Sequence, residues 1–123
     1  MAKILIVEDD ELMCECLDQI ISDWGHTTVT AHDVDEALAL LGSPRPLDLM
    51  KTDIRLKTAM LGGYDLAQLA RRDRPALHVL YATGDSMTAA HAAMFVGGAT
   101  HIHKPYKEAQ LRAALDDLLG TTV

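Results

Sequence analysis

Apolar and polar residues follow one another in blocks along this chain, and the blocks predict two kinds of element. Short, nearly continuous apolar runs bounded by charged residues, glycine or proline are typical of strands buried on both faces. Such runs occur at residues 3–7, 26–30, 47–53, 76–82 and 99–103. Each is followed by a stretch with helical signals, which are apolar residues three or four positions apart, a capping residue or a run of alanines. These stretches cover residues 11–24, 33–41, 64–72, 86–95 and 107–119.

The alternation of these elements predicts the fold class. Five strands and five helices in turn, without repeats or low-complexity tracts, are typical of a parallel sheet with helices on both faces. The predicted fold is therefore a doubly wound α/β domain. In such sheets the functional residues lie beyond the carboxyl ends of the strands.

Composition limits the possible partners and location. The 123 residues are 49% hydrophobic, which suits one domain with an apolar core. The net charge is −7, and the basic residues are scattered apart from Arg71, Arg72 and Arg74, interpreted as a solvated helix end, so we expect no direct contact with nucleic acid. No run approaches the roughly 20 apolar residues of a membrane span and no signal peptide is recognisable, so we expect a cytoplasmic protein without membrane contact.

The two cysteines, Cys14 and Cys16, both lie in the first predicted helix. Residues two positions apart on a helix face different sides, so these thiols do not bridge easily. We expect both to be reduced, with Cys16 the more buried.

Polar side chains stand at the carboxyl ends of four predicted strands: Glu8, Asp9 and Asp10, then Asp53, Thr83 and Lys104. Clustered carboxylates repel one another unless a hard cation neutralises them, which favours Mg²⁺. With the metal bound, one carboxylate can attack phosphorus while a cation such as Lys104 holds the charge on the transferring oxygens. Each residue alone has an ordinary interpretation, and Asp10 is preferably an acidic residue at a helix N-terminus, where the helix dipole favours negative charge. Their joint placement favours a site.

Four segments in order, ILIVEDD, DLMKTDIRL, VLYATGD and HKPY, resemble the receiver domain of bacterial response regulators. The resemblance covers essentially the whole chain, and the combination is far more specific than any one motif. It implies a flavodoxin-like, receiver-type fold with strand order 2-1-3-4-5. It also implies that Glu8 and Asp9 hold Mg²⁺, with Asp9 the direct ligand, that Asp53 is the phospho-acceptor and a ligand, and that the Arg55 backbone carbonyl is a further ligand.

The resemblance also implies how the domain signals. Thr83 would be the switch hydroxyl and Lys104 the cation that contacts the phosphoryl group. Pro105 would follow a cis peptide bond, and His101 occupies the position of the switch aromatic. A histidine kinase or histidine phosphotransfer protein would supply the phosphoryl group, and a downstream target protein would read the altered surface.

Three residues depart from the family pattern. Lys57 replaces a proline after the acceptor, which predicts a longer and looser loop over residues 57–62, and Gly63 comes about two positions late. Lys51 interrupts a strand that should be apolar, so its buried ammonium needs a partner or a route to water. We assign neither a partner nor such a route to Lys51 at this point.

We expect residues 1–123 to form a single receiver domain without an output domain, monomeric or weakly dimeric, that is no enzyme beyond its own phosphorylation and dephosphorylation. Two alternatives are left open by the sequence. One is a receiver excised from a larger protein, and the other is a phosphorylation-independent interaction module with the same fold. A metal-dependent phosphohydrolase is disfavoured because no Asp-x-Asp-x-Thr motif follows the first strand, and a flavodoxin because a phosphate cradle does not use three carboxylates.

Overall fold

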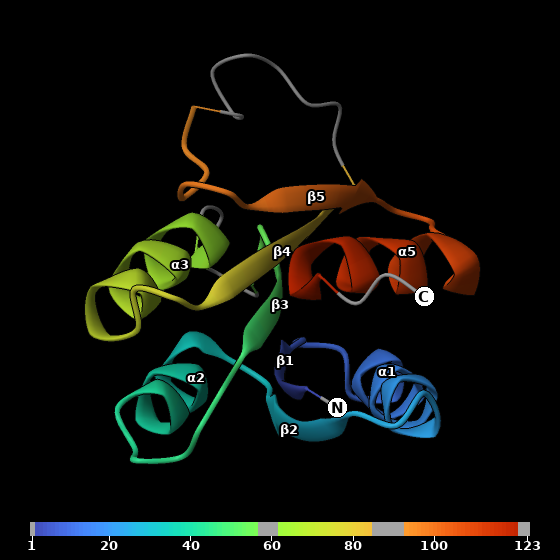
Figure 1. Cartoon of the computed structure of the whole chain (residues 1–123), viewed down its shortest axis with the longest axis horizontal. Coiled ribbons are helices and arrows are strands. Elements are labelled where there is room, and N and C mark those ends of the chain that lie inside the picture. The colour runs from blue at the N-terminus through green and yellow to red at the C-terminus, as the bar shows by residue number, and fades with distance from the viewer. Residues whose placement is uncertain (1, 57–61, 85–92, 121–123) are drawn as a thin grey trace.

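The computed structural model describes residues 2–56, 62–84 and 93–120. Its centre is a five-stranded parallel sheet in the order β2-β1-β3-β4-β5. The strands are β1 Lys3–Val7, β2 Thr27–Ala31, β3 Leu49–Asp53, β4 His78–Thr83 and β5 Thr100–His103. The predicted fold class and strand order are confirmed (Figure 1).

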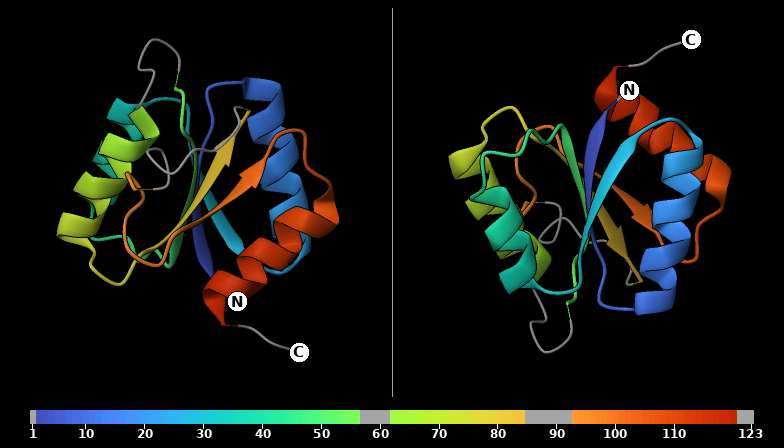
Figure 2. Two further views of the ribbon diagram at one scale, coloured as in Figure 1. Left: turned by 90° about the horizontal axis from the view of Figure 1, so that it is seen from above. Right: turned by 90° about the horizontal axis from the view of Figure 1, so that it is seen from below.

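Helices cover both faces of the sheet. They are α1 Glu11–Asp23, α2 Val34–Leu41, α3 Gly62–Asp73 and α5 Glu108–Leu119. Helices α1 and α5 lie on one face, and α2 and α3 on the other (Figure 2). Most of the helix predicted over residues 86–95 lies outside the described residues, as does the loop at 57–61, and residues 93–95 form a turn. Within the described ranges, no helix has the length and apolar character needed to cross a membrane.

The helix starts follow the capping residues in two cases. The Asp10 side chain accepts a hydrogen bond from the backbone N–H of Met13, and Asp33 accepts one from Glu36. These bonds satisfy amide donors that a helix leaves free at its amino end. The interpretation of Asp10 as an acidic residue at a helix amino end is confirmed, and the hydrogen bond shows that it also caps α1.

Helix α3 starts earlier than predicted, at Gly62 instead of Tyr64. Its first turn packs directly against the end of β3, where the Gly63 N–H donates to the carbonyl of Ile54 at 2.9 Å. A Cβ at position 63 would overlap the carbonyl oxygen of Asp53 and lie 2.8 Å from the Ile54 Cα. Only glycine permits this approach, which gives the displaced glycine a structural reason.

Two apolar layers flank the sheet. The layer under α2 and α3 contains Leu5, Met50, Leu66 and Tyr81, and the layer under α1 and α5 contains Ile4, Ile6, Leu49, Leu80, Leu111 and Leu115. Alternate residues of each strand point to opposite layers. Strand β3 is buried along its whole length, so each of its polar side chains needs a hydrogen-bond or charge partner within the protein.

The face of α1 that packs on the sheet is narrower than its apolar stripe. Cys14, Leu17 and Ile21 are buried, whereas Cys16 is exposed. The prediction that Cys16 is the more buried thiol is wrong, because position 16 lies outside the buried 14, 17 and 21 face. Both thiols are free.

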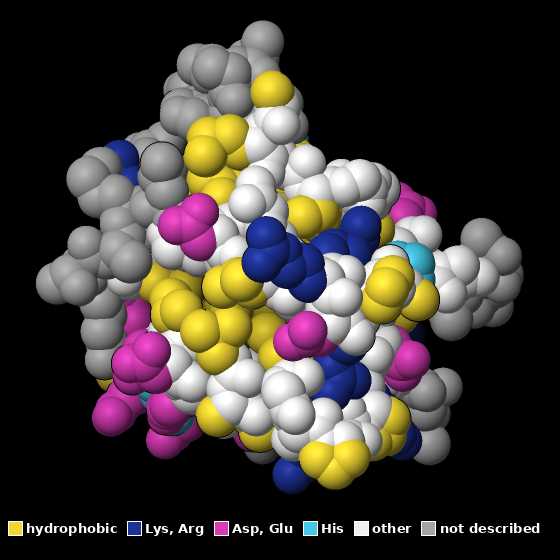
Figure 3. Space-filling view, turned by 90° about the vertical axis from the view of Figure 1, so that its left-hand side faces the viewer, with side chains coloured by type: hydrophobic (Ala, Val, Ile, Leu, Met, Phe, Trp, Pro, Cys, Tyr) yellow, Lys and Arg dark blue, Asp and Glu magenta, His cyan; other side chains and the backbone are white. Residues whose placement is uncertain are grey.

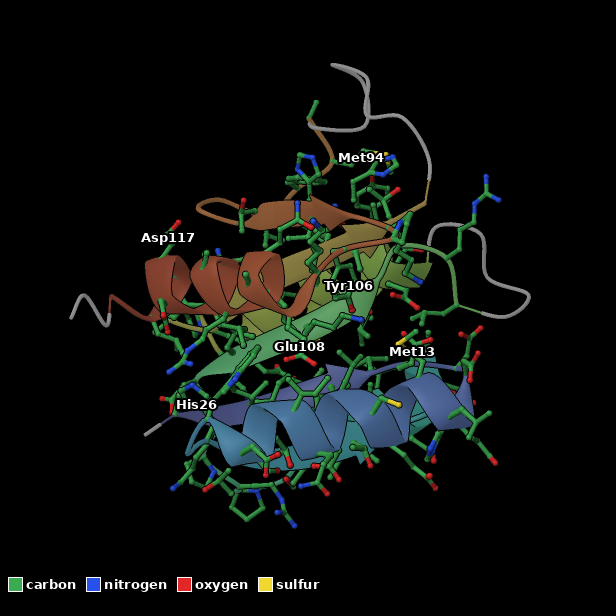
Figure 4. All side chains as sticks on the ribbon, turned by 90° about the vertical axis from the view of Figure 1, so that its right-hand side faces the viewer. Met13, His26, Met94, Tyr106, Glu108 and Asp117 are labelled. Carbon is green, nitrogen blue, oxygen red and sulfur yellow. The ribbon has the colours of Figure 1, made fainter. Side chains whose placement is uncertain are left out.

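The outer part of the stripe lines a groove of about 470 Å³ between α1 and α5. Met13 and Ile20 of α1 lie along it, with Tyr106 and Leu111 opposite. Met13, Tyr106 and Glu108 are labelled around this groove in Figure 4.

Two arginines of α3 and its following loop tie neighbouring segments together. Arg71 donates to the carbonyl of Leu77, and Arg74 donates to the carbonyls of Leu41 and Ser43. Figure 3 shows Lys and Arg side chains set between hydrophobic ones on this side of the molecule. Arg71 lies in the last turn of α3 as expected, but both side chains are half-buried and bonded to backbone carbonyls, so they are not simply solvated.

Candidate functional site

The carboxyl ends of four strands meet at one edge of the sheet. Asp53 ends β3, Thr83 ends β4, and Glu8 directly follows β1. Lys104 directly follows β5, and its backbone N–H donates to the carbonyl of Thr83 at 2.7 Å. The residues predicted from four separate segments therefore lie together, as parallel strands require.

A cavity of about 240 Å³ opens at this edge, lined by Asp53, Ile54, Arg55, Ala82, Thr83, Gly84 and Lys104. Thr83 is buried and Arg55 is exposed. The cavity thus carries the predicted acceptor, hydroxyl and cation on its walls. It is large enough for a small anionic group.

Three carboxylates converge beside the cavity. One oxygen from each of Glu8, Asp9 and Asp53 lies within 4.8 Å of the others. Glu8 and Asp53 are buried and Asp9 is partly buried. Burial, reinforced by the neighbouring Asp53, raises the pKa of Glu8 to about 7. Glu8 therefore holds a proton over much of the range where an ordinary glutamate is charged.

Asp53 has the opposite behaviour. Burial acts to raise its pKa, but the charge of Lys51, a hydrogen bond with Glu8 and the charge of Lys104 together hold that pKa below its usual value. The Lys104 Nζ lies 3.0 Å from Asp53 Oδ1, and the Lys104 side chain is 39% exposed. Asp53 is thus an ionised carboxylate at neutral pH, which a nucleophile toward phosphorus must be.

Lys51 is the residue whose role the sequence left open. Its side chain is fully buried, with Nζ 3.4 Å from Asp53 Oδ1 and 3.5 Å from Glu8 Oε2. Its Nζ also lies 6.0 Å from the centre of the Tyr106 ring. Burial lowers the pKa of Lys51, but Asp53, Tyr106 and Glu8 more than offset this and raise it overall. Lys51 is therefore a charged ammonium within the site.

A sequence signal for Lys51 existed. Residues two apart on a strand point to the same side, so Lys51 must share a face with Asp53. The buried ammonium needs a partner, and this spacing points to one. Asp53 is that partner.

Besides Thr83, the predicted output residues are His101 and Pro105, which lie at different places. His101 is exposed on β5, and its ring packs edge-on against Phe95 at 5.6 Å between centroids. Phe95 in turn stacks on Tyr81 at 4.4 Å. Pro105 follows a cis peptide bond, as the resemblance implies, and lines the groove between α1 and α5.

The donor set fits a magnesium ion. Mg²⁺ prefers oxygen ligands and is held by one or two carboxylates together with waters and phosphate oxygens. Glu8, Asp9 and Asp53 offer carboxylate oxygens close enough to share one ion. Burial is the main cause of the raised pKa of Glu8 and the neighbouring Asp53 adds to it; a divalent cation would relieve the repulsion between these carboxylates.

Sequence comparison finds relatives along almost the whole chain. The family described as response regulator receiver domain matches residues 4–116. The nitrogen assimilation regulatory protein NtrX of Azorhizobium caulinodans is 32% identical over 119 residues, covering 96% of this chain and 26% of that protein. Response regulator MprA of Mycobacterium ulcerans is 31% identical over 121 residues, covering 98% of this chain and 51% of that protein. This chain thus spans from about a quarter to about half the length of these curated relatives.

Solved structures share the fold. A response regulator receiver protein from Sinorhizobium medicae has a TM-score of 0.87 and 25% identity, covering 98% of this chain and 95% of that chain. NtrX from Brucella abortus has a TM-score of 0.81 and 31% identity, covering 98% of this chain and 26% of that chain.

Proposed function

This chain belongs to the response regulator receiver domain family, and on that basis we propose that Asp53 accepts a phosphoryl group from a phosphohistidine donor. A carboxylate oxygen of Asp53 attacks phosphorus, the phosphorus–nitrogen bond of the donor breaks, and the bonding pair leaves with the imidazole. The observation that carries this proposal is the position of Asp53. It is ionised, ends the central strand and faces a cavity shared with Thr83 and Lys104.

The surrounding groups have distinct roles in the proposal. Glu8, Asp9 and Asp53, with the Arg55 backbone carbonyl, hold Mg²⁺, which when bound supplies positive charge to the transferring oxygens. Lys104, 3.0 Å from Asp53, contributes a second positive charge at the cavity mouth. The Thr83 hydroxyl donates a hydrogen bond to the phosphoryl group. It moves inward when Asp53 is phosphorylated.

The output of this reaction is a changed protein surface. Phosphorylation replaces the single negative charge of the Asp53 carboxylate with nearly two on the phosphoryl group, beside Thr83 and Lys104. The phosphorylated conformation is favoured only by contacts that the unphosphorylated one lacks. We propose a histidine kinase or phosphotransfer protein as donor and a downstream protein as target, with β5, α5, His101 and Pro105 in the responding surface. The chain would act in the cytoplasm, and its catalysis would be limited to its own phosphorylation and dephosphorylation.

Acetyl phosphate with Mg²⁺, followed by intact mass measurement, tests this proposal. We expect a gain of one phosphoryl group in the wild type, none in Asp53→Asn, and none when EDTA removes the metal. Asp48→Asn is the matched control, because Asp48 is exposed at the opposite end of β3, and it should gain the group normally. A wild type that stays unmodified, both here and with a phosphorylated histidine donor, would instead support a phosphorylation-independent interaction module.

A further inference from the structure

Lys51 differs from Lys104 in how firmly its charge is held. Both ammonium groups lie near Asp53 Oδ1, at 3.4 and 3.0 Å. The Lys104 side chain is 39% exposed and can turn toward water, whereas Lys51 is fully buried. Lys51 pairs with Ile6 on β1 and Leu80 on β4 in the sheet register, so apolar strands flank it on both sides. Its charge therefore stays in the pocket when a ligand enters.

The formal charges of the pocket show the consequence. Three carboxylates, from Glu8, Asp9 and Asp53, lie beside two ammonium groups. Each ammonium group beside these carboxylates offsets part of the negative charge that a divalent ion would otherwise balance. An apolar residue at position 51 would remove one of these positive charges.

The lysine also competes with the metal for the same groups. Its Nζ contacts Glu8 and Asp53, which are two of the three carboxylates that converge. These distances are longer than the usual 2.7–2.9 Å of a charge-assisted hydrogen bond, roughly by half an ångström. Lys51 thus lies between the two carboxylates without a short bond to either. Its positive charge partly offsets the negative charge of both.

We propose that Lys51 is a built-in cation that takes over part of the charge balance otherwise supplied by Mg²⁺, and so weakens metal binding at this site. The inference rests on the Mg²⁺ site of the proposed function and adds a residue that sets its affinity. Lys51 is a positioning residue here, because it acts on the metal through Glu8 and Asp53. It keeps the carboxylates paired when the metal is absent.

Mg²⁺ titration followed by backbone amide NMR shifts measures the affinity directly. In Lys51→Met we expect binding about tenfold tighter or more, because Glu8 and Asp53 lose a neighbouring positive charge that offsets their own. Lys3→Met is the matched control, since Lys3 is exposed at the opposite end of β1. Its affinity should stay within about twofold of the wild type, since a distant exposed charge is screened.

Equal or weaker Mg²⁺ binding in Lys51→Met overturns the inference. Circular dichroism reports whether the variant folds, and Lys51→Gln, which keeps polar contact without charge, provides a second test with the same expected tightening. If neither variant folds, a measurement on the wild-type protein tests the inference. The ¹⁵N resonance of the Lys51 ammonium should shift as Mg²⁺ saturates the pocket, and an unchanged resonance at saturation overturns the inference.

Failure of this inference and failure of the proposed function give different results. A wild type that gains a phosphoryl group while Lys51→Met shows no change in affinity keeps the proposed function and loses the inference. Tighter metal binding in Lys51→Met without phosphoryl gain in the wild type keeps the inference and loses the proposed function. Absence of Mg²⁺ binding in the wild type and both variants overturns both the metal site and the inference.

Discussion

The two layers that flank the sheet obey different physical rules. The layer under α2 and α3 consists of apolar and aromatic side chains, with Tyr64 and Tyr81 packed against each other. In the layer under α1 and α5, a charged row formed by Glu8, Lys51 and Asp53 continues the apolar packing toward the carboxyl edge.

The two layers should therefore differ in how their stability responds to pH and to metal ions. An apolar layer is stabilised by burial and close packing, which change little with pH or metal. A buried charged row is costly unless each charge is paired, so it responds to protons and cations. In the layer under α1 and α5, a proton or cation that binds at the carboxyl edge of the sheet therefore changes the charge balance of buried side chains.

The most damaging change to the apolar layer should be Leu66→Ala. Leu66 is fully buried in that layer, so we expect a loss of about 3–4 kcal/mol in the free energy of unfolding from the cavity left behind. Leu69→Ala on the same helix is the control, because Leu69 is 40% exposed, and it should cost less than about 1 kcal/mol. Urea unfolding with and without Mg²⁺ measures both. A Leu66→Ala loss that depends on Mg²⁺ would contradict the separation of the layers.

A second, smaller loss is expected where α3 meets β3. Gly63→Ala places a methyl group against the backbone of Asp53 and Ile54, which should cost about 2–3 kcal/mol through overpacking. Gly97→Ala is the matched control, since no atom lies within 4 Å of the added carbon there, and it should change stability by about 0.5 kcal/mol or less. Thermal and urea unfolding of both variants check this. Equal stability of the two variants would refute the close-approach explanation.

The smallest expected effect sharpens the comparison through pH. The folded pKa of Glu8 is about 7 against 4.5 for the ordinary group, so between these values the folded state binds more protons than the unfolded state. Stability contributed by protonated Glu8 is therefore present below pH 4.5 and is lost as pH rises through about 7. In EDTA we expect this loss to be about 1–2 kcal/mol relative to Glu8→Gln.

Urea unfolding between pH 4.5 and 7 measures that difference. Glu15→Gln, an exposed position on α1, should follow the wild-type curve. Saturating Mg²⁺ at pH 7 should restore stability to the wild type, because a ligand that binds only the folded state stabilises it. Parallel curves for the wild type and Glu8→Gln in EDTA would rule out a raised pKa for Glu8.

Sequence reasoning predicted the elements well and the contacts unevenly. All five strands were placed within two residues of their ends, because continuous apolar runs and turn residues are local signals. The buried face of α1 was predicted too wide, because an apolar stripe does not tell which residues face the sheet and which line a groove. The start of α3 was missed because the close approach of Gly63 depends on the strand that it touches.

The candidate site, too, could be predicted from the sequence only in part. Asp53, Thr83 and Lys104 could be predicted to converge, because parallel strands bring their carboxyl ends to one edge. The Mg²⁺ ligands and the acceptor role remain predictions that the experiments above address. The ion pairs of Lys51 were not predicted, although its spacing from Asp53 placed both on one face.

By itself, the sequence determined the alternation of elements, the parallel sheet and the edge that carries the acidic residues. Period and turn chemistry are properties of short segments, and strands that alternate with helices are typical of a parallel sheet. Only the tertiary structure decided that Lys51 lies between Glu8, 43 positions away, and Asp53. Charge pairing in a buried layer depends on which strands become neighbours, and that is settled only when the whole sheet has formed.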